Sequence, residues 1–168
     1  MIFTKSYVRV ILLIIATVII LLLPTLLRDS SGYITEEPYF LERISNLLRD
    51  KNTEIDNLSY IERPFTYLLA QPFILSLFNN LNEKAILILP ILFGIISLIL
   101  FYFILKKLNI SQNIRDLSAI ILIISPPFIY TFSHYNSFSI AVPFLLFVSL
   151  LFLQENKFLK ILSILLTF

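Results

Sequence analysis

Residues 85–105 read AILILPILFGIISLILFYFIL, a stretch without a single charged side chain. A helix needs about 20 predominantly apolar residues to cross the hydrocarbon core of a bilayer, and this stretch has that length. Pro90 and Gly94 interrupt it, but membrane helices tolerate both residue types because neighbouring helices cover the backbone groups that they free. The stretch therefore predicts a membrane-spanning helix.

Further apolar runs lie on both sides of this stretch. The run at 8–27 is long enough to span and has no small-residue cleavage site after it, so it predicts a retained anchor rather than a signal peptide. The runs at 117–132 and 138–153 predict two more spans, joined by the short polar turn 133–137. A last apolar run begins at 157 and has too few residues to cross, which favours a fragment of a longer protein.

The composition agrees with a membrane protein. Hydrophobic residues make up 58% of the chain and charged residues 14%, which leaves too little polar surface to cover a soluble domain in water. We therefore expect an all-α membrane protein with about four to five transmembrane helices. The chain has no cysteine, which excludes thiol chemistry and thiolate metal sites. Its net charge of +2 is small and indicates no nucleic-acid partner.

The basic residues of the short loops indicate the orientation. If residues 65–81 do not span, the N-terminus and the loops after the second and fourth spans share one side, which is then cytoplasmic. The segment 28–84 becomes an outer loop in which acidic residues outnumber basic ones. If residues 65–81 did span, the basic loop 106–115 would lie outside. We therefore expect a multi-pass protein of the cell membrane, with residues 65–81 forming a juxtamembrane or re-entrant helix. The residues that carry this pattern are Lys5, Arg9, Lys106, Lys107, Arg115, Lys157 and Lys160.

The outer loop contains a second helical pattern at residues 38–49. Its apolar residues recur at helical spacing and its other face is charged or polar, which predicts an amphipathic helix. Such a helix is expected to lie on the membrane surface with its apolar stripe in the acyl boundary. The stripe consists of Phe40, Leu41, Ile44, Leu47 and Leu48.

Two adjacent carboxylates, Glu36 and Glu37, precede this helix close to the outer interface. Paired acids there are suited to taking a proton from an acceptor hydroxyl, or to holding Mg²⁺ or Mn²⁺ through hard oxygen ligands. The alternative is that they only complement the positive end of the helix dipole.

Three further positions are candidates for binding. Arg63 stands at the water–lipid boundary before residues 65–81, where its guanidinium is suited to a lipid phosphate; the alternative is an ordinary interfacial arginine. His134 lies in the outer turn 133–137 and is suited to a sugar or phosphate, unless it is simply a polar turn residue. The Ser125-Pro126-Pro127 step interrupts the third span and either opens a cavity or bends the helix.

The order of these features resembles the N-terminal part of GT-C class membrane glycosyltransferases, which use polyprenyl-phosphate-linked sugars. The resemblance runs from Val8 to Leu153 and rests on hydropathy, on the acidic pair, and on a few stretches. These are RPFTYLLAQPFILSLF (63–78), LPILFGIISLILFYFILKKL (89–108) and SPPFIYTFSHYNSFSIAVPFLLFVSLLFL (125–153).

The resemblance implies that Glu36 and Glu37 carry the catalytic base or a metal ligand, and that Arg63, His134 and Tyr135 bind substrate. It implies transfer of a sugar from a polyprenyl-phosphate donor to an acceptor on the outer face of the membrane. The turn 133–137 has no acidic residue, which favours a monosaccharide transferase of the protein-mannosyltransferase or lipid-modifying type over an oligosaccharyltransferase.

Two other classes of function remain open. One is a non-enzymatic membrane scaffold or assembly subunit, in which the outer loop docks another protein. The other is a transporter fragment, which would be expected to place ionisable residues near the middle of the membrane.

Overall fold

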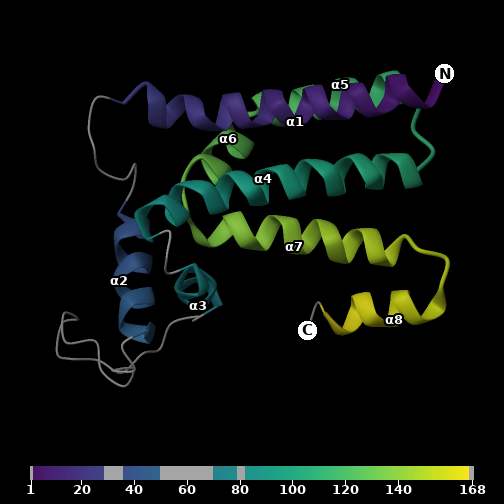
Figure 1. The fold of residues 1–168 in the computed structure, drawn as a ribbon. Helices are drawn as coiled ribbons and strands as arrows, with labels where there is room; N and C mark the ends of the chain where they lie inside the picture. Colours follow the sequence, from purple (N-terminus) through teal and green to yellow (C-terminus); the bar gives the residue numbers. More distant parts are fainter. Residues whose placement is uncertain (1, 29–35, 50–69, 79–81, 167–168) are drawn as a thin grey trace.

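The computed structural model describes residues 2–28, 36–49, 70–78 and 82–166. Within these ranges the regular structure is helical throughout and no strand is present (Figure 1). The all-α prediction is therefore confirmed. The helices are α1 (Ile2–Leu26), α2 (Glu37–Arg49), α3 (Ala70–Leu77), α4 (Asn82–Lys107), α5 (Gln112–Ile124), α6 (Pro126–Ser133), α7 (Ser137–Phe152) and α8 (Lys157–Leu165).

The long helices lie alongside one another and reverse direction at each connection (Figure 1). Helix α4 is central, since it packs against α1, α5, α6 and α7. Helices α2 and α3 and the α6–α7 turn gather at one end of the bundle, which we call the α2 end. The N-terminus, the α4–α5 connection and the α7–α8 turn gather at the other, which we call the amino-terminal end.

Three apolar clusters hold the bundle together. One joins α2, α3 and α4 to the α6–α7 turn, a second joins α1 to α6 near mid-bundle, and a third joins α1, α4 and α5 nearer the amino-terminal end. Many large apolar side chains elsewhere on α1, α4, α5 and α7 are exposed. This outward apolar surface suits lipid or further helices better than water.

Among the described residues, two helices are long and apolar enough to cross a membrane, over residues Tyr7–Leu26 and Lys84–Lys107. They coincide with the predicted spans at 8–27 and 85–105. The count rises to three if α5 and α6 together form one broken span. Helix α7 has 16 residues and is about 24 Å long, shorter than the hydrocarbon core of about 30 Å. The expected number of four to five spans is therefore not confirmed for the described residues.

The predicted span at 117–132 is divided into α5 and α6, which meet at an angle of 60°. The break lies at Ser125, whose extended backbone ends α5 and begins α6. Pro126 and Pro127 occupy the first turn of α6, where a helix needs no N–H donor. The carbonyl of Leu122 accepts both the backbone N–H and the hydroxyl of Ser125, at 3.1 and 2.7 Å. The sequence left open whether this step opens a cavity or bends the helix, and the structure shows a bend.

The outer-loop predictions are confirmed in part. Helix α2 begins one residue before the predicted amphipathic helix and ends with it. Helix α3, with eight residues, is about 12 Å long and too short to span, as expected for the part of 65–81 that is described. Two residues of the predicted stripe, Leu41 and Ile44, are buried within the protein, and Leu41 packs with Leu75 of α3 and residues of α4. At these two positions protein contacts replace the expected contacts with lipid.

Candidate functional site

The α6–α7 turn is organised by Asn136. Its carboxamide oxygen accepts the backbone N–H groups of Phe138 and Ser139, at 2.8 and 3.0 Å, and so caps α7. Its amide nitrogen donates to the carbonyls of Thr131 and His134, at 2.9 and 3.2 Å. The side chain is 2% exposed. With both ends of the carboxamide engaged, the turn has a defined conformation at the α2 end.

Glu37 of α2 reaches this turn across 100 positions of sequence. One carboxylate oxygen, Oε1, accepts the backbone N–H of Ser137 at 2.9 Å and the Ser137 hydroxyl at 2.7 Å. Glu37 is the first residue of α2, and Ser137 is the first residue of α7. The carboxylate therefore lies at the positive ends of two helix dipoles. Glu37 therefore complements a helix dipole, which was the structural alternative for the acidic pair. It does so for two helices, α2 and α7.

Glu36 has different surroundings. Its side chain is exposed, and its backbone carbonyl accepts the N–H of Phe40, at 3.3 Å, in the first turn of α2. Within the described ranges its carboxylate makes no hydrogen bond or ion pair. The acidic pair thus consists of one carboxylate held by the fold and one turned to the surroundings.

His134 is 5% exposed and lies next to Ser133, with its Nδ1 3.4 Å from the serine hydroxyl. Its ring packs edge-on against Tyr130, with ring centroids 4.7 Å apart. Burial lowers the pKa of His134 below its ordinary value, and the negative charge of Glu37 partly opposes this. The imidazole is therefore neutral near pH 7 and lies within the electrostatic influence of Glu37.

Tyr135 is fully buried and packs with the apolar cluster of α2, α3 and α4. Burial raises the pKa of its hydroxyl well above the ordinary value. A direct contact of Tyr135 with substrate stays a prediction.

Two further predictions concern phosphate binding by Arg63 and the binding of a metal ion. Arg63 lies outside the described residues. Among residues 2–28, 36–49, 70–78 and 82–166, no three His, Asp or Glu side chains come together as a metal-binding group. The structure therefore brings together Glu37, His134 and Tyr135 of the expected site residues, with Glu36 next to them in the chain. It adds Asn136 and Ser137, which the sequence had not singled out.

A second polar cluster lies at the amino-terminal end. Asp116 of α5 accepts from Arg9 of α1 at 2.9 Å and from the Tyr102 hydroxyl of α4 at 3.0 Å. The Arg115 guanidinium stands over the Tyr102 ring, 5.2 Å from its centroid. These contacts tie three helices together. The feature of the sequence that could have indicated this cluster is Asp116, an acidic residue directly before the apolar run at 117–132.

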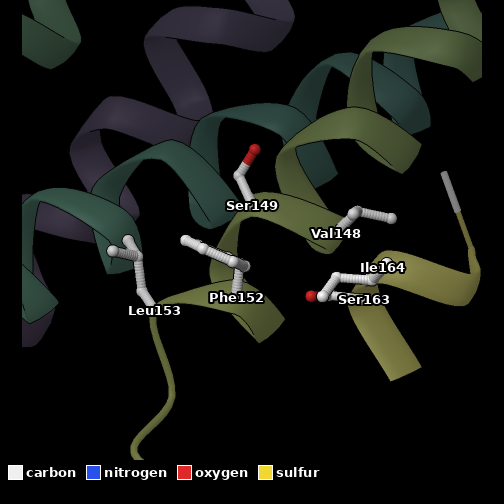
Figure 2. A pocket seen from close by; sticks show the side chains of 6 residues that line it. All are labelled: Val148, Ser149, Phe152, Leu153, Ser163 and Ile164. Carbon is white, nitrogen blue, oxygen red and sulfur yellow. The ribbon is translucent and has the colours of Figure 1, made fainter. Parts of the chain in front are cut away.

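A pocket of about 450 Å³ lies between α7 and α8 (Figure 2). Its lining is mostly apolar, and the hydroxyls of Ser149 and Ser163 both donate to carbonyls of their own helices. None of the expected site residues lines it. The lining residues are Val148, Ser149, Phe152, Leu153, Ser163 and Ile164.

Comparisons with protein-family models, with curated proteins and with solved structures find no match to this chain.

Proposed function

We propose that the chain is the N-terminal portion of a multi-pass glycosyltransferase of the cell membrane. It transfers a sugar from a polyprenyl-phosphate-linked donor to an acceptor at the α2 end, which faces away from the cytoplasm. The N-terminus is cytoplasmic, and the unequal charge of the two ends supports this orientation.

The observation that carries the proposal is the contact between Glu37 and Ser137. This contact joins the two segments that contain predicted site residues, the start of α2 and the turn before α7. A carboxylate pair, a neutral imidazole and a capped helix start then share one end of an apolar bundle. A lipid-linked donor is accessible at such a place, because its chain stays in the bilayer while its headgroup reaches the interface.

In the proposed reaction the acceptor hydroxyl attacks the anomeric carbon of the donor. The bond from that carbon to the phosphate oxygen breaks, and the polyprenyl phosphate leaves with the electron pair. Glu36 takes the proton of the hydroxyl, since it is exposed, whereas Glu37 Oε1 already accepts two donors. Glu37 holds the start of α2 against the turn, and Arg63 stabilises the departing phosphate.

A divalent cation is compatible with this proposal. Mg²⁺ is commonly bound through one or two carboxylates together with substrate phosphates, and hard carboxylate oxygens are what Glu36 and Glu37 offer. In that case Glu36, with Glu37 as the second carboxylate, would hold Mg²⁺ or Mn²⁺ instead of acting as the base. The ion would supply positive charge to the leaving phosphate.

The test measures the release of polyprenyl phosphate from a panel of polyprenyl-phosphate sugars, using membranes that contain the full-length protein. Glu36→Gln should lower the release rate by about 100-fold or more, the contribution expected of a positioned base. Glu155→Gln, which changes an exposed carboxylate at the amino-terminal end, should leave the rate unchanged. Normal release by the double variant Glu36→Gln/Glu37→Gln at equal expression would remove the catalytic claim.

A further inference from the structure

Three cationic side chains gather at the amino-terminal end where α4 ends and α5 begins. Lys106 and Lys107 form the last turn of α4 and are exposed. Arg115 lies in the first turn of α5. We call Lys106, Lys107 and Arg115 the cation cluster.

The fold orients Arg115 toward α4. Its guanidinium lies over the ring of Tyr102, at 5.2 Å, a cation–π arrangement. Lys106 follows Tyr102 by four residues and therefore lies on the same face of α4, one turn closer to the helix end. Two positive charges are thus directed to one face of α4. Like charges so close repel each other unless an anion lies between them.

The neighbouring carboxylate does not supply that anion. Asp116 Oδ2 pairs with Arg9 at 2.9 Å, and Asp116 Oδ1 accepts from Tyr102 at 3.0 Å. Both of its oxygens are thus engaged by donors other than Arg115. The Nε atom of Arg115 is buried and has no hydrogen-bond partner within the part of the chain that the structure describes. Among the described residues, the three cations of the cluster form no ion pair, so the cluster retains unneutralised positive charge.

Apolar side chains border the cation cluster. Phe103 and Leu108 on α4 and its connection, and Ile114 and Leu117 on α5, are each about half exposed. The cations thus stand at the edge of an apolar surface, at the level where the acyl chains of a bilayer end and its phosphates begin. A free phosphate ion would contact the cations alone. A phospholipid can contact the cations through its phosphate and the apolar surface through its acyl chains.

We propose that the cation cluster binds the headgroup phosphate of an anionic membrane lipid, with Arg115 as the anchor and Lys106 and Lys107 adding charge. Arg115 offers paired N–H donors to the phosphate oxygens, and the lysines act as point charges beside it. This site lies at the opposite end of the bundle from the proposed sugar transfer, and the two proposals are independent.

The experiment is native mass spectrometry of the full-length protein in neutral detergent, with phosphatidylglycerol and phosphatidylcholine added at equal concentrations. The unmodified protein should retain phosphatidylglycerol in preference. Each basic residue near a charged membrane surface contributes an attraction equivalent to about fivefold in affinity, so Lys106→Gln/Arg115→Gln should weaken retention by about 25-fold. Lys84→Gln, an exposed lysine at the α2 end, is the matched control and should change nothing.

Two further variants keep the test decisive if the double variant does not fold. Lys107→Gln alters only an exposed side chain and should weaken retention by about fivefold. Lys106→Arg/Arg115→Lys preserves the charge but loses the paired donors at position 115, so it should retain the lipid better than Lys106→Gln/Arg115→Gln and less well than the unmodified protein. Equal retention by the unmodified protein and Lys106→Gln/Arg115→Gln would overturn the proposal, as would an equal loss in Lys84→Gln. Displacement of the lipid by millimolar inorganic phosphate would overturn the choice of a lipid as the ligand.

Discussion

At the scale of single residues, Glu37 has a structural role at the place where the catalytic site is proposed. Its carboxylate accepts two hydrogen bonds from Ser137 and lies at the start of both α2 and α7. Hydrogen bonds to an ionised acceptor are shorter and stronger than those between neutral groups. The contact therefore fixes where α2 sits relative to the turn, and with it where Glu36 can act.

His134 provides a prediction about pH, since it is the only histidine of the chain. Burial lowers its pKa in the folded protein below the ordinary 6.5, against a smaller opposing effect of Glu37. In that case the unfolded chain binds a proton more readily than the folded one, so protonation favours unfolding. The stability that neutral His134 contributes is complete above its ordinary pKa and is lost as the pH falls toward the folded value.

The expected result is a fall in melting temperature between about pH 7 and about pH 5 that is steeper in the unmodified protein than in His134→Gln. Circular dichroism in detergent, followed against temperature at each pH, measures it. Glu155→Gln, at an exposed position far from the turn, controls for general charge effects and should follow the unmodified protein. Parallel curves for the unmodified protein and His134→Gln would contradict the prediction.

The sequence allowed part of this site to be predicted. Glu36, Glu37 and His134 could be singled out because their side-chain chemistry and their place near the interface are local properties. Ser137 and Asn136 could not. Ser137 matters through a contact with a residue 100 positions away, and no local pattern encodes that distance. Tyr135 was expected to bind substrate because of the family resemblance, but its complete burial comes from the packing of α2, α3 and α4 around it.

At the scale of helices, hydropathy predicted where α1 and α4 lie, but the predicted number of spans is not confirmed for the described residues. Apolar composition does not specify backbone direction, and the Ser125-Pro126 step turns one apolar run into two helices at 60°. The same limit applies to α2. Its periodicity predicted an apolar stripe but not whether lipid or α3 and α4 would cover it, because both surfaces are apolar.

Gly94 of α4 lies where α1 and α6 approach α4 closely. A Cβ atom at this position would lie 2.7 Å from Leu21 Cδ1 of α1 and 3.1 Å from Phe132 Cβ of α6. Leu21 is fully buried and Phe132 is 1% exposed, so the added bulk would enter the protein interior. Gly94→Val should therefore destabilise the bundle by about 1–3 kcal/mol or more, the range for overpacked cores.

Unfolding of purified Gly94→Val in mixed detergent micelles with increasing dodecyl sulfate measures this loss. Leu92→Phe adds bulk on an exposed part of the same helix, where the side chain is 45% exposed, and should unfold like the unmodified protein. If Gly94→Val were as stable as Leu92→Phe, the three helices would not be in contact at this point.

At the scale of the whole molecule, the two ends of the bundle differ in chemistry. The α2 end carries the acidic pair and the capped turn, while the amino-terminal end carries the cation cluster and the Asp116 contacts. Helix reversal at each connection produces this separation, because every second loop returns to the same end (Figure 1). A bilayer presents different surfaces on its two sides, so this difference translates into an orientation.

The absence of cysteine from the chain makes that orientation directly measurable. Asn46 of α2 and Asn113 of α5 are both exposed and lie at opposite ends of the bundle. We expect a membrane-impermeant maleimide to label Asn46→Cys in intact cells, because the α2 end is proposed to face outward. Asn113→Cys should be labelled only after the cells are opened. The reverse pattern would place the acidic pair in the cytoplasm, where the proposed transfer at the outer face cannot occur, whereas equal labelling of both positions in intact cells would contradict a bundle that spans the membrane.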